Sequence, residues 1–330
     1  MPHITSDDLQ ILLERALGTR GFGPAHATAL ARQTVLSEEM GQASVGVSHV
    51  FDYLDGIAGG RINGHANPEI SRPVPTMIHV DGDGGLPQTG FDMAFDTLTA
   101  SAHELGLCVF LQKNTTLCGS LGTFARRVAE AGLVVFAATN GSALLAGSGG
   151  SKPVFCTNPM AFAAPQSGGP PLLIDQSSSA TAYVNIRKAA ERGDAIPEGW
   201  ALDADGQPTT DPKAAVSGTL LAFGGARGAN IALMVDVLAG GLTGANWSVE
   251  APGFMDGNAC PGTGLFVLAI NPVLVTPDFN DRMAVQIARL SGDYGVHIPG
   301  LSKEQAQRDA RENGLDIDAG MLDRLRAIAG

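Results

Sequence analysis

The first 60 residues show the apolar spacing of three consecutive α-helices. The first helix follows the cap residues Thr5 and Ser6 and ends at Gly18, and the second opens at Pro24. The third ends at a Gly-Gly pair. Its apolar stripe consists of Val47, Val50, Phe51, Leu54 and Ile57.

From about residue 73 the pattern changes to short apolar runs that are typical of β-strands. These runs read MIHV, LCVFL, LVVFAATN, PLLID and, later, GLFVLAINP. Helical spacing returns at 90–105, 120–131 and 231–242, and Ser302 with Gln305 forms a capping box for a last helical pair. We therefore predict an α/β fold with two domains: residues 1–72 with 275–330 form a helical domain from both termini, and residues 73–274 form the strand-rich domain.

Composition and charge narrow the class of protein. The chain has 330 residues, which suits two subdomains, and its 44% apolar content, 16% charged content and 43 glycines favour a glycine-turned α/β enzyme. A formal net charge of −12, with no Lys/Arg run, excludes a nucleic-acid partner. The first ten residues carry acids where a signal peptide needs bases, and no apolar run reaches the length of a membrane span, so we expect a cytoplasmic protein.

Short motifs exclude several common sites. Cys108, Cys118, Cys156 and Cys260 contain no CxxC pair, so neither a metal site nor a disulfide scaffold is predicted. VDGDGGLPQTG does not fit GxGxxG, and GGSKP lacks the spacing of a P-loop. Segments 147–153, 155–165 and 223–230 are candidate ligand-binding loops, because glycine frees backbone amides there.

These loops stand in order with further motifs, and the whole set resembles the type-2 malate/L-lactate dehydrogenase family. The further motifs are RINGHANPEI, LLID, AAERGDAIPEGWALDADGQPTTDP, GLTGANWS and HIPG. The resemblance implies a homodimer whose NAD(P)-binding domain has a mixed, largely antiparallel, non-Rossmann sheet, joined to a helical domain from both termini. It also implies hydride transfer from NAD(P)H to small 2-oxo or 2-imino acids. GLTGANWS and FCTNP are most similar to the branch that reduces Δ1-pyrroline-2-carboxylate and Δ1-piperideine-2-carboxylate.

The resemblance also implies which residues contact the ligands. Thr157 and Asn158 match substrate and nicotinamide contacts. The cofactor-binding positions are Thr116, Leu117, Cys118, Gly119, Ser120, Asp175, Gln176, Ser177, Ala226 and Arg227. The last two stand in GGARG, where the family has GGHKG, and an arginine can hold a phosphate in bidentate fashion.

The chain departs from the family at its catalytic relay. Members read SHGVxR, whereas this chain reads SVGVSH from Ser44, so Val45 replaces the relay histidine and His49 replaces the substrate-binding arginine. Asn185 stands in place of the relay aspartate, and Leu117 replaces the histidine of NHFG. We predict Ser44, His49 and Asn185 as catalytic residues and His49 as a substrate contact. Capping of the third helix is an alternative role for Ser44.

These replacements favour an imine over a ketone as the substrate. Hydride addition to a ketone makes an alkoxide that needs a proton from a placed acid, and losing such an acid costs about 10²- to 10⁴-fold in rate. A protonated imine gives a neutral amine instead. We therefore predict an NAD(P)H-dependent reductase of a small cyclic 2-imino acid that forms the L-amino acid. A 2-hydroxy-acid dehydrogenase and a catalytically silent cofactor-binding protein are the alternatives.

Overall fold

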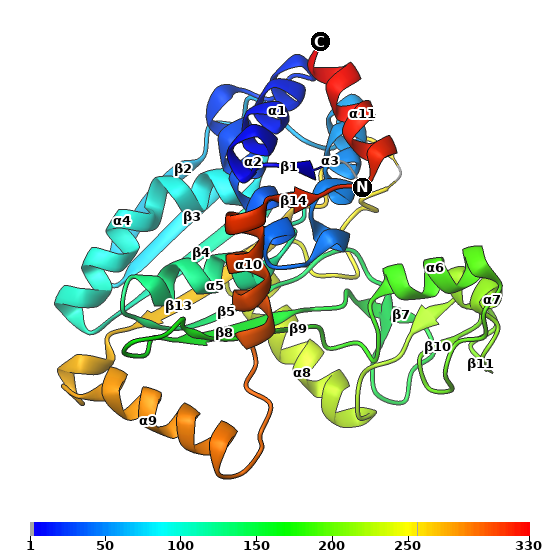
Figure 1. Cartoon of the computed structure of the whole chain (residues 1–330). Coiled ribbons are helices and arrows are strands. Elements are labelled where there is room, and N and C mark those ends of the chain that lie inside the picture. Colours follow the sequence, from blue (N-terminus) through cyan, green and yellow to red (C-terminus); the bar gives the residue numbers. More distant parts are fainter. Residues whose placement is uncertain (1–2, 256) are drawn as a thin grey trace.

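The computed structural model describes residues 3–255 and 257–330 and is built around a seven-stranded sheet (Figure 1). The strand order is β2-β3-β4-β13-β5-β8-β9. Only β3 and β4 pair in parallel within this sheet of the described chain; the other neighbours are antiparallel. The α/β class and the mixed, mostly antiparallel sheet are thus confirmed. The strands are β2 (Glu69–Val74), β3 (Met77–Gly85), β4 (Leu107–Thr115), β5 (Val134–Thr139), β8 (Met160–Ala164), β9 (Leu172–Gln176) and β13 (Thr263–Ile270).

Both faces of this sheet are covered, which explains why its strands read as nearly continuous apolar runs. On β13, Leu265 and Val267 belong to the core beneath α4 (Pro87–Leu105) and α5 (Leu121–Glu130). Phe266, which points to the opposite face, packs with Val235 of α8 (Ala226–Asp236). The alternation along one strand therefore separates two cores.

A smaller lobe lies beside the main sheet and has a core of its own. Its strands are β6 (Leu145–Ala146), β7 (Pro153–Phe155), β10 (Ala201–Leu202), β11 (Pro208–Thr209) and β12 (Thr219–Leu220), in the order β11-β10-β12-β6-β7. Two helices, α6 (Tyr183–Arg192) and α7 (Pro212–Val216), cover it. Buried Leu145, Ile186 and Leu220 form the centre of this lobe.

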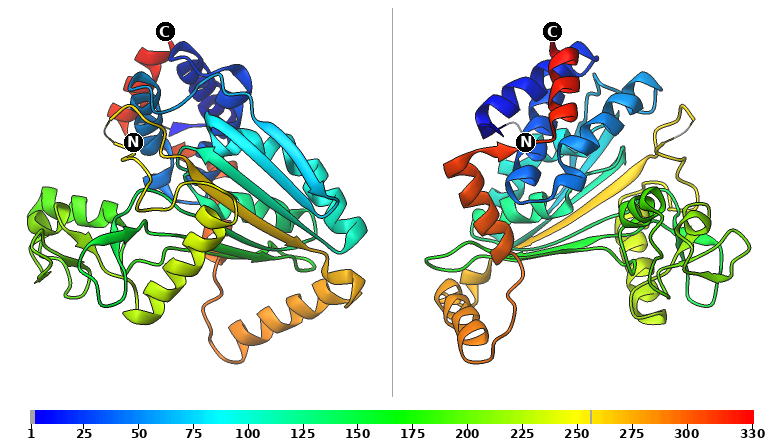
Figure 2. Two further views of the ribbon diagram at one scale, coloured as in Figure 1. Left: turned by 180° about the vertical axis from the view of Figure 1, so that it is seen from behind. Right: turned by 45° about the vertical axis from the view of Figure 1, so that its right-hand side comes forward.

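The two ends of the chain share a third core (Figure 2). It unites α1 (Ser6–Thr19), α2 (Pro24–Glu39) and α3 (Val47–Ala58) with α11 (Ala319–Ala329), and Leu9, Leu13, Leu322 and Leu325 are fully buried within it. The short strands β1 (His3–Ile4) and β14 (Leu315–Asp316) pair next to it. The three predicted amino-terminal helices are confirmed, with Thr5 as the first N-cap.

Some predicted helix boundaries were wrong. α4 begins at Pro87 rather than at residue 90, and α8 begins at Ala226 and continues into a π-helical turn, Val237–Gly241. The predicted capping box is absent. The N-cap of α10 (Leu301–Asn313) is Gly300, which adopts a φ of +94°, and Ser302 lies inside the helix. Of the described helices, none combines the length and apolar character needed to cross a bilayer.

Candidate active site

Ser44 lies just before α3, in a single 3-10 turn (Ala43–Val45), and does not cap the helix. The Val47 amide, in the first turn of α3, instead donates to Glu38 Oε1 at 2.6 Å. A Cβ at the N-cap residue, Gly46, would lie 2.2 Å from this carboxylate, so glycine lets the Glu38 side chain approach the start of the helix. The capping role considered for Ser44 is therefore wrong. Burial raises the pKa of the Glu38 carboxyl, and this outweighs the bond from Val47, which lowers it.

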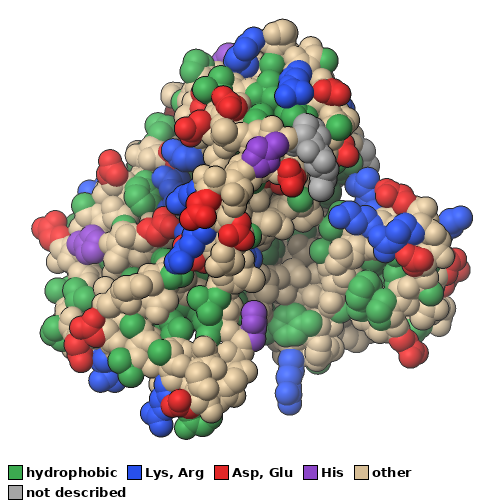
Figure 3. All heavy atoms as spheres, in the orientation of Figure 1, with side chains coloured by type: hydrophobic (Ala, Val, Ile, Leu, Met, Phe, Trp, Pro, Cys, Tyr) green, Lys and Arg blue, Asp and Glu red, His purple; other side chains and the backbone are tan. Residues whose placement is uncertain are grey.

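Ser44 borders a cleft of about 560 Å³ between the helical core and the smaller lobe. Glu38 and Asp52 line the cleft on the helical side, and Arg187 and Lys188 of α6 line it on the other side. Basic side chains gather at this side of a hollow in the surface (Figure 3). Glu191, Asp316 and Asp318 also line the cleft, so Arg187 and Lys188 are its two cations among five carboxylates. These two side chains are the groups of the lining that could bind a carboxylate.

His49 lies one turn further along α3 and is held on two sides. Its Nδ1 is 2.7 Å from Asp52 Oδ2, and its ring packs edge-on against Tyr53 with centroids 4.8 Å apart. The Tyr53 hydroxyl donates to the Leu117 carbonyl at 3.0 Å, and burial raises the pKa of this phenol. Together with Thr116 and Leu117, His49 lines a small cavity. Asp52 lines both this cavity and the large cleft, so its side chain lies between the two.

Asn185 does not join Ser44 or His49. It is exposed on α6, donates to Thr181 Oγ1 at 3.1 Å, and lines a separate cavity with Trp200. Asn185 stands at the relay position in the sequence, but its side chain does not line the cleft.

Thr157 and Asn158 follow β7, and only the threonine is partly exposed. Asn158 is fully buried at a φ of +37°, and its side-chain nitrogen donates to the Ala232 carbonyl at 2.8 Å. The Ser248 hydroxyl lies 3.4 Å from Asn158 Oδ1 and donates its hydrogen to buried Asp236 at 2.6 Å. Because these bonds occupy its side chain, Asn158 fixes the loop, and Thr157 is the residue left for contact with substrate.

The segment Thr116–Ser120 leads into α5, where it meets Asp175. The Asp175 carboxylate accepts from the Gly122 amide in the first turn of α5 at 3.1 Å, and a Cβ at Gly122 would lie 2.7 Å from it. Lys303 of α10 approaches the same carboxylate at 3.9 Å. Two cofactor segments predicted from the sequence are thus adjacent.

The residues that follow Asp175 lead from β9 toward α8. Gln176 is exposed at its end, and Ser177 bonds Ser179 at 3.0 Å. Backbone bonds then connect Ser178 to the Thr157 carbonyl and the Phe223 amide. The predicted substrate and cofactor segments are therefore neighbours in the fold.

Ala226 opens α8 at the edge of a cavity of about 460 Å³. Gly147–Gly150 and Gly224–Gly225 line it, and nothing lies within 4 Å of a Cβ built on Gly224 or Gly225. Both adopt a positive φ, and the next residue but one, Arg227, is exposed. A helix start beside open glycine loops, with an exposed arginine in its first turn, is suited to the diphosphate of a dinucleotide, so these residues fit NAD(P)H.

Cys118 lies in the predicted cofactor loop but is 5% exposed, and burial raises the pKa of its thiol to about 12. A thiolate is scarce at such a site, so we assign Cys118 a packing role. All four cysteines are free. No group of three metal-ligating side chains occurs in residues 3–255 and 257–330.

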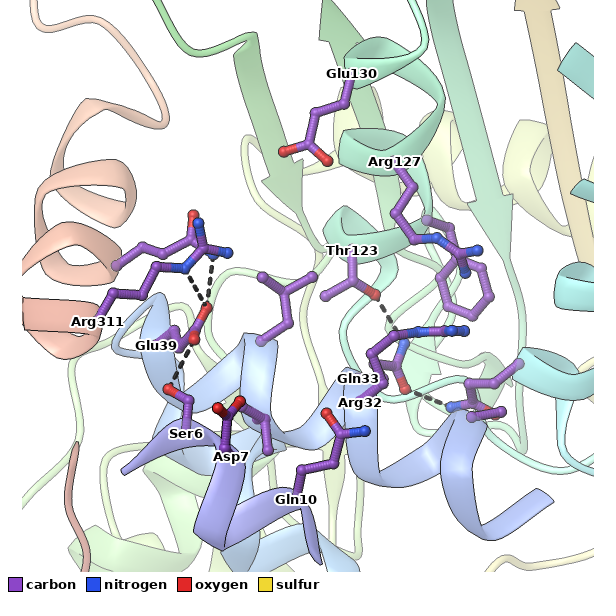
Figure 4. A pocket seen from close by; sticks show the side chains of 16 residues that line it. Ser6, Asp7, Gln10, Arg32, Gln33, Glu39, Thr123, Arg127, Glu130 and Arg311 are labelled. Carbon is purple, nitrogen blue, oxygen red and sulfur yellow. Dashed lines mark hydrogen bonds and ion pairs between the residues drawn. The ribbon is translucent and has the colours of Figure 1, made fainter. Parts of the chain in front are cut away.

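A separate cavity of about 300 Å³ between α1, α2, α5 and α10 is polar but lies away from this chemistry (Figure 4). At its centre, Glu39 is 6% exposed and accepts from Ser6 at 2.8 Å, Gln307 at 2.7 Å and Arg311 at 3.3 Å. Glu39 ends α2, Ser6 begins α1, and Gln307 and Arg311 belong to α10. The cluster therefore connects α10 to the amino-terminal helices.

Sequence reasoning missed Asp52, Arg187, Lys188 and Lys303. The spacing of His49 and Asp52, three apart on a helix, was the one local signal for such a pair. The other three approach the site from distant segments, and their spacing in the chain gives no such signal.

Comparison with known proteins identifies a family along nearly the whole chain. The profile of the malate/L-lactate dehydrogenase family matches residues 4–326. A (2R)-3-sulfolactate dehydrogenase (NADP(+)) of Chromohalobacter salexigens is 33% identical, over 99% of this chain and 98% of the relative. A Δ1-pyrroline-2-carboxylate/Δ1-piperideine-2-carboxylate reductase of Pseudomonas putida is also 33% identical, over 98% and 96%. The crystal structure of a Δ1-piperideine-2-carboxylate reductase from Pseudomonas syringae superposes with a TM-score of 0.96 at 30% identity, covering 99% and 100% of the two chains.

Proposed function

The chain belongs to the malate/L-lactate dehydrogenase family, and from this premise we propose that it reduces a small cyclic 2-imino acid with NAD(P)H. The product is the L-amino acid, and the substrate is of the Δ1-pyrroline-2-carboxylate or Δ1-piperideine-2-carboxylate type. Relatives that carry these names support the choice.

The observation that carries this choice is the polar content of the site. Val45 has no acidic group, and Asn185 lies in another cavity, so the family relay is absent. An imine nitrogen is basic enough to take a proton before hydride arrives, whereas a ketone oxygen needs a strong acid during the transfer itself. A site with one imidazole is therefore better suited to an imine.

Two departures from the family face each other in the structure. Leu117 stands where relatives have a histidine, and His49 stands where they have an arginine, and both line the same small cavity. The cavity thus lacks an imidazole at position 117 but has one at position 49. This exchange supports a functional role for His49 rather than an accidental surface position.

The lost arginine requires another group for the substrate carboxylate. Arg187 and Lys188 line the cleft opposite Ser44, and we assign them this role, with Ser44 and Thr157 as further polar contacts. An arginine can bind a carboxylate through two parallel hydrogen bonds. The ring of the substrate would then lie beside Asp52, which lines both the cleft and the His49 cavity.

The cofactor supplies the hydride when bound. The glycine loops around α8 and exposed Arg227 would hold its diphosphate, and the band from Thr116 to Asp175 would hold the remainder. Arg227 suits either NAD or NADP.

The test is cofactor oxidation by the purified protein with Δ1-pyrroline-2-carboxylate, Δ1-piperideine-2-carboxylate, oxaloacetate, pyruvate and 3-sulfopyruvate. We expect kcat/KM for a cyclic imine to exceed that for every keto acid. Preference for a keto acid would instead establish the second candidate, a 2-hydroxy-acid dehydrogenase, which the equally similar sulfolactate dehydrogenase supports. Cofactor binding without turnover of any substrate would favour a silent homologue.

We propose that the protein acts as a homodimer. α9 (Phe279–Gly292) and its flanking segments expose Val275 at 88%, Val285 at 68% and Tyr294 at 64%, and Ile287 is the one buried residue of the helix. Apolar groups exposed in this number favour a subunit interface. Light scattering coupled to gel filtration would show a mass near twice 33.9 kDa. The two-domain boundaries, the non-Rossmann character and the cytoplasmic location remain predictions.

A further inference from the structure

We propose that Asp52 positions His49 as the proton donor of the active site. The pair lies on one turn of α3. It takes the place of the relay histidine, whose position is occupied by Val45 in this chain. This inference rests on the proposed function and names the group that protonates the imine. Asp52 does not react with the substrate in this proposal; it acts by orienting the His49 ring.

The geometry fixes the imidazole ring. Asp52 Oδ2 lies 2.7 Å from His49 Nδ1, and a carboxylate can only accept, so Nδ1 carries a hydrogen. Tyr53 holds the ring from the side at an interplanar angle of 68° and is itself 4% exposed. The His49 side chain is 15% exposed and that of Asp52 is 37% exposed. The ring is thus oriented by a charged partner at the edge of the cleft.

The second ring nitrogen is available to a ligand. His49 Nε2 makes no hydrogen bond within the described chain, and it is not one of the buried polar atoms that lack a partner. Water or a substrate can therefore reach it. With Nδ1 occupied by Asp52, Nε2 is the atom at which a proton is gained and lost.

The pair suits protonation of a neutral imine. The imine nitrogen takes the proton from Nε2 of the imidazolium, which leaves a neutral His49 and an iminium cation. Hydride then adds to the iminium carbon, the C=N electron pair moves to nitrogen, and the amine results. Asp52 stabilises the imidazolium before the transfer and the iminium after it, so no uncompensated charge arises. His49 regains its proton from solvent through the cleft.

Several other charged groups lie near the pair. Glu38, Asp316 and Asp318 line the cleft together with Asp52, and none of them bonds the His49 ring in the described chain. Arg61 lines the His49 cavity, but its guanidinium donates to the carbonyls of Asp55 and Gly257 at 3.0 Å each. Arg187 and Lys188 face Asp52 from α6. Among the described residues, Asp52 is therefore the carboxylate that bonds the ring.

The first measurement needs neither cofactor nor substrate. Nitrogen-15 spectra of the histidine rings distinguish the Nδ1–H tautomer from the Nε2–H tautomer, and the His49 signals are those that His49→Gln removes. We expect Nδ1–H in the wild type and loss of this preference in Asp52→Ala. The matched control is Asp55→Ala, an exposed acid on the same helix, which should leave the ring signals unchanged. A wild-type Nε2–H tautomer, or no response to Asp52→Ala, would overturn the inference.

The second measurement is turnover of a cyclic imine. We expect kcat to fall about 10²- to 10⁴-fold in His49→Gln and, because Asp52 acts through the ring, about 10- to 100-fold in Asp52→Ala, with KM nearly unchanged. Asp52→Asn, which keeps the shape of the side chain, covers the case in which the alanine variant does not fold. Wild-type kcat in a folded Asp52 variant would overturn the inference and leave the proposed function intact. If the wild type reduces no imine, the proposed function fails, and the ring spectra alone decide the role of Asp52.

Discussion

Replacing Glu39 by alanine tests whether the buried cluster in Figure 4 holds α10 against the amino-terminal helices. The substitution removes the acceptor of three hydrogen bonds. Gln307, 1% exposed and bonded at 2.7 Å, loses the partner of its amide nitrogen, and a bond of this kind to a charged group contributes about 1.5–3 kcal/mol. The Ser6 bond adds about 1 kcal/mol. Arg311 adds little, because its side chain is 62% exposed and solvent screens the pair.

We therefore expect Glu39→Ala to lower the free energy of unfolding by about 2.5–4 kcal/mol, which corresponds to about 4–6 °C in Tm for a chain of this length. Calorimetry of the wild type and the variant gives both quantities. Glu312→Ala is the matched control, since this exposed acid of α10 makes no hydrogen bond within the described chain and should change stability by less than about 0.5 kcal/mol. The double variant with Gln307→Ala should lose less than the two single variants added. A loss below about 1 kcal/mol in Glu39→Ala would refute the reasoning.

Three further predictions concern the cofactor segments. Gly122→Ala places a Cβ 2.7 Å from the Asp175 carboxylate, so we expect weaker NAD(P)H binding by titration calorimetry, by about tenfold, with the fold intact by circular dichroism; unchanged affinity would exclude Asp175 from the cofactor site. Arg227→Ala should also weaken cofactor binding about tenfold, whereas exposed Arg20→Ala should not, and equal behaviour of the two would contradict a phosphate contact at Arg227. Burial raises the pKa of Cys118 to about 12, above the value near 8.5 expected in the unfolded chain. Its contribution to stability is therefore complete below about pH 8.5 and is lost as pH rises toward 12, by about 1.4 kcal/mol per pH unit; urea unfolding at pH 7.5 and 9.5 should show this loss in the wild type and a smaller one in Cys118→Ser.

Local patterns and motif order along the chain were sufficient to predict most of the elements and the family. Apolar positions at helical spacing gave α1, α2 and α3, and nearly continuous apolar runs gave the strands that are buried on both faces. These signals are local, because one residue's neighbours within a turn or a strand carry them. Motif order along the chain was sufficient for the family, and the replacement of two family histidines by Val45 and Leu117 could be seen in the sequence itself.

Tertiary structure decided which of the predicted residues meet. Ser44 and Asn185 line different cavities, and the buried amide of Asn158 is used inside the protein. The spacing of His49 and Asp52 allows a bond between them, but only the folded chain shows that the two side chains meet at 2.7 Å beside a cavity. Lys303 and Asp175 are more than 100 residues apart in the sequence but meet in the fold. No local sequence pattern predicts such a contact.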